Sequence, residues 1–157
     1  MRWWIAAAVF ALDRVMKVLS FRLPGNGIIL IPGVVRLRLV RNEGIAFSLL
    51  SGRPWLLGAA SLIIILGACW FLRGKQLSKP AAVGVMMMLG GAAGNMVDRF
   101  FLGYVPDMIE MLFVDFAIFN AADVFLTVGC AVVIIHLLLR KEQNGESSGK
   151  PGHQGCR

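Results

Sequence analysis

The run from Pro54 to Leu72 reads PWLLGAASLIIILGACWFL and contains no charged residue. A bilayer requires about 20 consecutive apolar residues for one helical crossing. Trp55 and Trp70 stand near the two ends of the run, where lipid headgroups favour amphipathic aromatic rings. The run therefore predicts a membrane-spanning helix and indicates an integral membrane protein.

The composition of the whole chain points the same way. Hydrophobic residues make up 57% of its 157 residues, charged residues only 16%, and the mean hydropathy is +0.72. Four crossings would use about half of the chain and leave little room for a soluble module. The formal net charge of +7 could suggest a nucleic-acid partner, but lysine and arginine lie between and beyond the apolar runs. They form no basic face with interleaved aromatics, so we expect no nucleic-acid binding.

Two further segments, at about 80–100 and 116–139, are long enough to span a bilayer. In the first, Gly90 and Gly94 make a small-x-x-x-small face, which predicts close helix packing inside a bundle. The second is interrupted by polar residues that need an explanation. These residues are Asn120, Asp123 and His136.

The N-terminal segment, residues 3–21, opens with ten apolar residues before its first charge. Such a start could belong to a cleavable signal peptide, but no small-x-small cleavage site follows it. Asp13 and Lys17 stand at i,i+4, so they share a helix face and can neutralise each other inside a bundle. We therefore predict a fourth span here.

Basic residues predict the orientation of the bundle, because cytoplasmic loops are enriched in lysine and arginine. Arg73, Lys75 and Lys79 crowd the loop between the second and third spans, and Arg140 and Lys141 follow the fourth. Both termini are therefore predicted to be cytoplasmic. Residues 22–53 would lie outside, although they carry five arginines of their own.

Within this outer segment, residues 28–40 are β-branched and aliphatic, and Arg36 and Arg38 alternate with leucines. The alternation predicts a short sheet on the membrane surface, although its arginines could equally meet lipid phosphates. Residues 141–157 combine glycine, serine and charge, which predicts a disordered tail. The expected fold is an all-α membrane protein, with one domain over residues 1–140.

Metal and disulfide chemistry are not indicated. Cys69 and Cys130 lie inside apolar runs, Cys156 lies in the tail, and no C-x-x-C spacing occurs. His136 and His153 are isolated, and the sequence lacks H-E-x-x-H. We therefore expect neither a metal nor another cofactor.

Carboxylates beside the spans are the candidates for chemistry, because a charge at mid-membrane costs about 3 kcal/mol even on a lenient scale. Asp123 is predicted about two turns into the fourth span, after Asn120 on the same helical face. Asp107 lies in the connection before that span. Each acid has a plainer interpretation: Asp123 as a helix cap or bundle hydrogen-bond partner, and Asp107 as a solvated loop acid. Asp115 resembles an N-cap for the fourth helix.

Two carboxylates that approach each other in a partly dry cleft hold one proton between them, because like charges at close range cannot both ionise. Such a pair could activate water against an amide carbonyl and then protonate the leaving amine. A proton-coupled transporter and a purely structural membrane subunit are alternative functions. The transporter predicts that Asp123 matters far more than Asp107. A serine protease is not indicated, because the sequence offers no suitably placed histidine partner for a serine nucleophile.

Five stretches together resemble the bacterial lipoprotein signal peptidases, or type II signal peptidases, which are aspartic proteases of the inner membrane. In order and spacing they cover nearly the whole chain except its tail. They are Asp13-Arg14-Val15-Met16-Lys17; Asn42-Glu43-Gly44-Ile45-Ala46-Phe47; Gly90-Gly91-Ala92-Ala93-Gly94-Asn95-Met96-Val97-Asp98-Arg99; Val105-Pro106-Asp107; and Phe119-Asn120-Ala121-Ala122-Asp123. Departures from the family pattern include Pro106 before the first aspartate and Glu43 after Asn42.

The resemblance implies cleavage of a signal peptide from a prolipoprotein, on the amino side of a cysteine that carries diacylglycerol. Asp107 and Asp123 match the family's catalytic pair. The implied supporting and substrate-binding residues are Asp13, Lys17, Asn42, Gly44, Asn95, Asp98, Arg99, Asn120 and Ala122. Asp98 is expected to form a structural ion pair with the neighbouring Arg99, because a nearby cation favours its charged form.

The resemblance also implies an architecture and a location. Residues 22–53 would form a small extracytoplasmic β-cradle that clasps the substrate together with a loop at 101–116. The protein would lie in the bacterial inner membrane, with its active site near the outer face. Its expected partners are diacylglyceryl-modified prolipoproteins and membrane lipid, and we expect it to act as a monomer.

Overall fold

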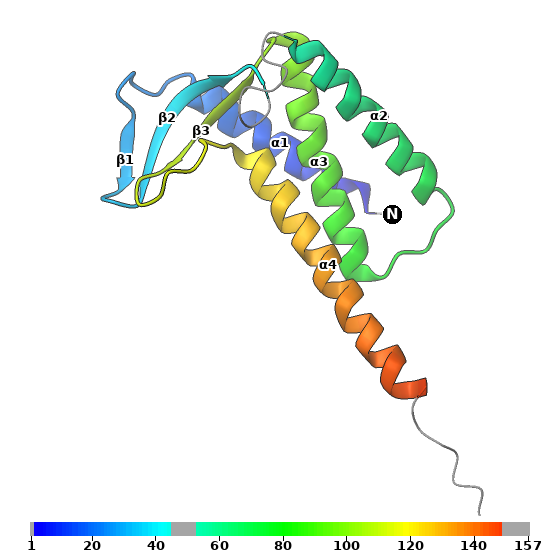
Figure 1. Cartoon of the computed structure of the whole chain (residues 1–157). Helices are drawn as coiled ribbons and strands as arrows, with labels where there is room; N and C mark the ends of the chain where they lie inside the picture. Colours follow the sequence, from blue (N-terminus) through cyan, green and yellow to red (C-terminus); the bar gives the residue numbers. More distant parts are fainter. Residues whose placement is uncertain (1, 45–52, 149–157) are drawn as a thin grey trace, which may run out of the picture.

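The computed structural model describes residues 2–44 and 53–148 of the chain (Figure 1). Within these residues the elements follow the order α1, β1, β2, α2, α3, β3, α4. The helices are α1 (Trp3–Ser20), α2 (Pro54–Leu72), α3 (Lys79–Phe101) and α4 (Ala121–Ser148). The strands are β1 (Ile28–Ile31), β2 (Val35–Asn42) and β3 (Val105–Met111).

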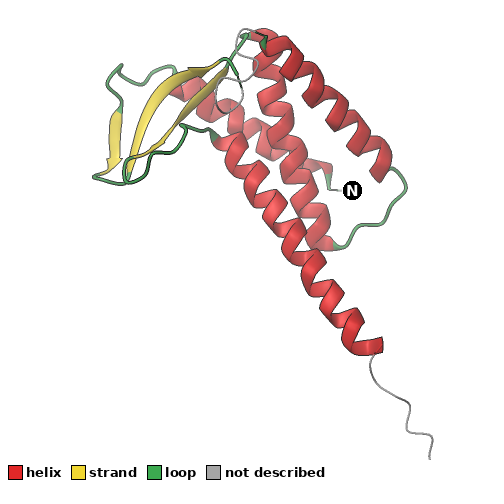
Figure 2. Cartoon of the chain, viewed as in Figure 1, coloured by secondary structure: helices red, strands yellow, loops and turns green. Residues whose placement is uncertain are grey.

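Helix α3 is the centre of the bundle and packs against α1, α2 and α4. The three strands gather at one end of the helices (Figure 2). At that end α1 finishes, α3 finishes and α4 begins, so the sheet lies beside three helix termini (Figure 1). This end of the bundle therefore brings residues from distant parts of the sequence together.

Three of the described helices are long and apolar enough to cross a membrane. They are Pro54–Leu72, Lys79–Phe101 and, within α4, Ala121–Lys141. The first coincides with the run from which the membrane assignment started. Helix α1 forms where the fourth span was predicted, but its charged residues keep it outside this set. Length and composition therefore establish a multi-pass helical protein with three candidate spans.

Glycines allow α3 to approach both of its main neighbours closely. A Cβ added at Gly90 would lie 2.6 Å from the carbonyl oxygen of Ala6 in α1. At the contact between α3 and α4, a Cβ added at Gly84 would lie 2.6 Å from the carbonyl oxygen of Gly129. The close packing predicted for Gly90 and Gly94 is therefore confirmed against α1, while Gly84 makes a second close contact, with α4.

Helix α4 begins later than the sequence predicted. The expected span began at residue 116 with Asp115 as its N-cap, but the helix starts at Ala121, and Asp115 lies in an exposed loop. Asn120 caps the helix instead: its side-chain Oδ1 accepts a hydrogen bond from the Asp123 N–H at 3.1 Å. At the other end, the helix continues to Ser148, so residues 141–148 of the predicted disordered tail are helical.

The strands of the predicted sheet are present, with β1 and β2 joined by a tight turn in which Gly33 has a positive φ of 71°. Both strand pairs are antiparallel, in the order β1-β2-β3. Strand β3 takes up residues 105–111 of the loop that was predicted at 101–116. Its pairing partner, β2, is far away in the sequence, and local pattern alone carries no signal for such pairing.

An ion pair holds β3 against β2. Arg36 Nε donates to Glu110 Oε2 at 2.6 Å, and Arg38 Nη2 donates to Glu110 Oε1 at 3.2 Å. The hydrogen bonds from these guanidinium groups hold the pKa of Glu110 at about 2, below its ordinary 4.5. Two of the arginines that could have met lipid phosphates are therefore engaged within the sheet.

The contact between α3 and α4 predicts a stability difference between two glycines. Gly84→Ala should lower the free energy of unfolding by about 1–3 kcal/mol, because the new methyl group has no room beside Gly129. Gly67→Ala in α2, where a Cβ would meet open space, should be neutral or slightly stabilising. Thermal unfolding in detergent measures both. Equal melting temperatures for the two variants would contradict the close contact.

A candidate active site between the sheet and the bundle

The two candidate acids come from different elements and meet at the sheet end of the bundle. Asp107 lies on β3, and Asp123 lies in the first turn of α4 rather than two turns into it. Three asparagines surround them. Asn42 ends β2, Asn95 lies in α3 and Asn120 precedes α4.

Asp107 is almost fully buried, with 2% of its surface exposed. Its Oδ1 accepts a hydrogen bond from Asn120 Nδ2 at 2.6 Å, and its Oδ2 accepts one from Asn42 Nδ2 at 2.9 Å. Burial raises the pKa of Asp107 from 3.8 to about 6, and the charge of Asp123 adds to this effect while the two amides oppose it. Asp107 is therefore not the solvated loop acid of the plainer interpretation.

Asp123 is anchored at the helix terminus. Its Oδ1 accepts a hydrogen bond from Asn95 Nδ2 at 2.8 Å, and its Oδ2 accepts one from the Asn120 N–H at 3.1 Å. Asn120 in turn accepts from the Asp123 N–H, so the two residues form a reciprocal cap. The helix N-terminus also favours a negative charge at this position.

The directions of two amides are fixed by backbone donors. An asparagine side chain has one acceptor end and one donor end, so an N–H at its oxygen settles which way it points. The Asp123 N–H occupies the oxygen of Asn120, and the Gly44 N–H occupies the oxygen of Asn42 at 3.1 Å. Both amides must then turn their N–H groups toward Asp107. Asn120 bridges the two acids.

A buried ionic layer lies behind the pair. Lys17 Nζ lies 2.9 Å from Asp13 Oδ2, which confirms the ion pair predicted from their i,i+4 spacing. Lys17 also lies 2.7 Å from Asp98 Oδ2, and Arg14 Nη2 donates to the same oxygen at 2.9 Å. The predicted pairing of Asp98 with Arg99 is wrong, because Asp98 pairs with Lys17 and Arg14 from α1, whereas Arg99 donates to the Asn95 carbonyl.

The supporting residues carried over from the resemblance have definite contacts. Asp13 Oδ1 accepts a hydrogen bond from the Ala122 N–H at 3.1 Å, which ties α1 to the start of α4. Arg99 Nη1 donates to the Asn95 carbonyl at 3.4 Å. Residues 45–47 of the second matching stretch lie outside the described residues. Arg14 was not predicted to take part in the ionic layer behind the acids, and its place beside Asp13 gave no separate signal.

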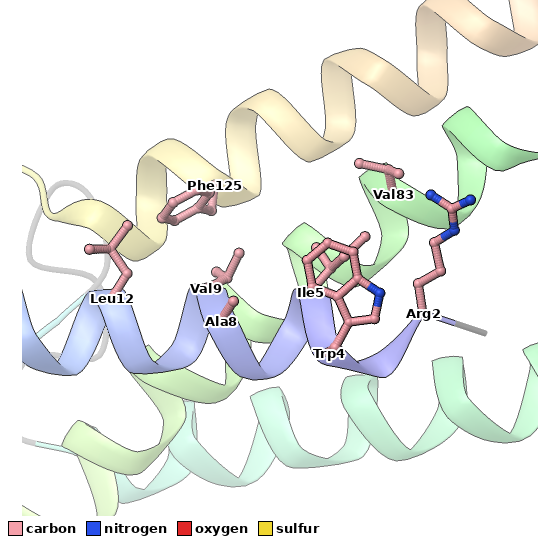
Figure 3. A pocket seen from close by; sticks show the side chains of 8 residues that line it. All are labelled: Arg2, Trp4, Ile5, Ala8, Val9, Leu12, Val83 and Phe125. Carbon is pink, nitrogen blue, oxygen red and sulfur yellow. The ribbon is translucent and has the colours of Figure 1, made fainter.

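An apolar groove lies apart from the acids. It has a volume of about 380 Å³ and is formed by α1, α3 and α4, with Leu12 toward one end and Arg2 at the other (Figure 3). Val9, Val83 and Phe125 contribute to its walls. Neither candidate acid lines it, so the groove supplies hydrophobic surface rather than acid–base groups.

Apolar helices that end beside two carboxylates bridged by Asn120 define a multi-pass membrane protein. Residues 5–139 match the family model described as signal peptidase (SPase) II. The chain belongs to this family.

Relatives in other bacteria carry the name lipoprotein signal peptidase. The chain is 38% identical to the one from Gloeobacter violaceus over 158 aligned residues, covering 98% of this chain and 91% of the relative. It is 40% identical to one from a Nostoc species, covering 92% of both chains. The relative from Streptococcus thermophilus is 36% identical, and the match covers 90% of this chain and 84% of the relative.

Solved structures agree with the sequence relatives. One, described as a bacterial membrane enzyme, superposes with a TM-score of 0.77 at 28% identity, covering 98% of this chain and 92% of the other. A second with the same description gives a TM-score of 0.76 at 32% identity, covering 85% and 90%. The fold is therefore that of a known bacterial membrane enzyme.

The raised pKa of Asp107 predicts a pH-dependent loss of stability. The folded pKa of about 6 exceeds the ordinary 3.8, so the contribution is full below about pH 4 and is lost as the pH rises through 6. The loss should be about 1–3 kcal/mol. Asp107→Asn cannot ionise, so its melting temperature relative to wild type should rise between pH 4.5 and 7.5.

Asp115→Asn is the matched control, because this aspartate is exposed in the loop after β3. Its melting temperature relative to wild type should stay constant over the same pH range. A constant difference for Asp107→Asn as well would contradict the buried, raised carboxyl.

Proposed function

We propose that this protein is an aspartic endopeptidase of the bacterial inner membrane. It removes the signal peptide from prolipoproteins on the amino side of a diacylglyceryl-modified cysteine. Membership of the signal peptidase II family supports the substrate class. The observation that carries the aspartic mechanism is the bridge through Asn120, whose Nδ2 donates to Asp107 while its backbone N–H donates to Asp123.

The reaction follows from one proton shared by two carboxyl groups. In the reactive form of the pair we assign the shared proton to Asp107, because burial raises its pKa to about 6, and ionised Asp123 takes a proton from water as the water oxygen attacks the scissile carbonyl. Asp107 gives its proton to the carbonyl oxygen. When the tetrahedral intermediate collapses, the C–N bond breaks, and the proton held on Asp123 passes to the leaving amine. The carbonyl proton returns to Asp107.

Helix α1 is the fourth span in this proposal. Asp13 and Lys17 are 0% and 2% exposed, so their charges face the bundle and are paired there. The outward face of α1 carries large apolar side chains instead, including Trp4 and Val18, which are 68% and 60% exposed. A helix with such charges can cross a bilayer, because charges inside a membrane occur where they face the interior of the bundle and are paired.

The orientation puts the acids at the outer face. Basic residues favour the cytoplasm at the opposite end, in the α2–α3 loop and after α4. The acyl chains of the substrate would stay in the bilayer while its peptide bond reaches the acids at the interface. Strand β1, Ile28–Ile31, exposes four consecutive aliphatic residues, which suits contact with the membrane surface.

The transporter alternative has less support. It requires a membrane-embedded acid to act as a relay and gives Asp107 no part. Asp107 is instead the more buried of the two acids and is held by two amides. The relatives described above, which carry the name lipoprotein signal peptidase, also favour the peptidase.

Cleavage by purified protein in detergent tests the acids. Asp107→Asn and Asp123→Asn should each lower the rate on a diacylglyceryl-modified prolipoprotein by at least 10²–10⁴-fold, roughly what proton transfer contributes. Asp115→Asn, in the exposed loop, should cleave like wild type. Asp98→Asn should lower the melting temperature, because Lys17 and Arg14 lose their shared partner.

Full activity of Asp107→Asn would contradict the proposed catalytic pair. Loss of activity in Asp123→Asn alone would require a different acid in place of Asp107. Absence of cleavage by folded wild type would return the transporter to consideration.

Single-cysteine labelling tests the fourth span. In a background without native cysteines, Gly25→Cys, just after α1, should react with a membrane-impermeant maleimide in intact cells. Arg2→Cys and Lys75→Cys should react only after the membrane is permeabilised. Labelling of Arg2→Cys in intact cells would show that α1 does not cross.

A further inference from the structure

Among the described residues, Lys17 is the one cation of the ionic layer that contacts an asparagine side chain beside the acids, that of Asn95. Only 2% of its surface is exposed. An ammonium group has three N–H donors and no acceptor. Lys17 Nζ lies 2.9 Å from Asp13 Oδ2, 2.7 Å from Asp98 Oδ2 and 2.7 Å from Asn95 Oδ1, so each donor has one acceptor.

The third of these contacts decides which way the Asn95 side chain points. Because Lys17 can only donate, the Asn95 oxygen must face it. The Asn95 NH2 group is then turned the other way, and it donates to Asp123 Oδ1 at 2.8 Å. If the amide were reversed, its oxygen would face the carboxylate and its NH2 group would face the ammonium, so both contacts would become repulsive.

Asn95 differs in this respect from the other two asparagines at the acids. Asn42 and Asn120 are oriented by the backbone N–H groups of Gly44 and Asp123, which no substitution except proline removes. Asn95 is oriented by a side chain from another helix. Its direction therefore depends on Lys17.

We propose that Lys17 is a positioning residue that orients the Asn95 amide and so keeps an N–H donor on Asp123. This inference deepens the proposed function and rests on it. Lys17 acts through Asn95, and no hydrogen bond in the described structure joins it to either acid. Its two carboxylate partners hold the ammonium group in place.

Arg14 provides a matched control. It lies in the same ionic layer and binds Asp13 and Asp98, but its remaining hydrogen bond goes to the Gly94 carbonyl and not to the Asn95 side chain. Lys17→Met and Arg14→Met each remove one positive charge and keep an unbranched apolar side chain. Lys17→Met alone also removes the contact with Asn95, and it removes a charge that lowers the pKa of Asp107. The cycle with Asn95→Leu described below separates these two effects.

Both variants should lower the melting temperature in detergent. Lys17→Met should also lower kcat for cleavage of a diacylglyceryl-modified prolipoprotein by about 10–100-fold at unchanged KM, the usual effect of a lost hydrogen bond to a charged group. Arg14→Met should keep kcat within about threefold of wild type. An equal loss of kcat in the two variants would overturn the proposal, because the layer would then act through its charge alone.

A double-mutant cycle with Asn95→Leu separates the route through Asn95 from any other. In the Asn95→Leu background, Lys17→Met should cause no further loss of kcat. A full additional 10–100-fold loss in that background would overturn the proposal.

A charge-compensated variant covers the case in which Lys17→Met does not fold. Asp13→Asn together with Lys17→Met removes one charge of each sign, and Asp13→Asn alone is its reference. The double variant should have a kcat about 10–100-fold below that reference, and equal values would overturn the proposal. Failure of wild type and Arg14→Met to cleave would instead count against the proposed function itself.

Discussion

The pairing of buried charges is the constraint on which the rest of the bundle depends. Asp13, Lys17 and Asp98 are at most 2% exposed, in a protein whose surroundings are largely apolar. Removing one partner of such a group typically costs 3–5 kcal/mol, because an uncompensated charge remains buried. The ion pairs therefore fix how α1 and α3 lie against each other. The Asp13 contact with the Ala122 N–H extends this constraint to the start of α4.

The candidate active site is built on that fixed frame. Because the start of α4 is held by α1, the reciprocal cap between Asn120 and Asp123 has a defined place beside α3. Strand β3 then brings Asp107 to the same point, and the ion pairs of Glu110 hold β3 against β2. Each acid is therefore positioned by secondary structure rather than by a free loop, which suits a reaction that requires exact placement of a proton.

Local features of the sequence were predictable, and pairings between distant segments were not. The apolar run at Pro54–Leu72 and the i,i+4 pair of Asp13 and Lys17 depend on spacing within one helix. Strand β3 and the true partners of Asp98 depend on contacts with segments far away in the sequence. Asp115 precedes an apolar residue and was predicted to cap α4. Asn120 caps the helix instead, because Asp123 stands three residues later and completes a reciprocal cap. The two acids were candidates because carboxylates beside a span are costly, and the resemblance matched them and implied the three asparagines. Which amide donates to which carboxylate required the structure.

The bridge through Asn120 has a consequence for the loop at 112–118. Ile109 and Phe119 pair through their backbones, so the loop is closed at its base before either acid is reached. Its residues 112–117 are exposed. Doubling the length of such a loop costs only about 0.6 kcal/mol in closure entropy. The chain between the two acids can therefore grow, shrink or change its surface chemistry across species without altering the distance between the carboxyl groups.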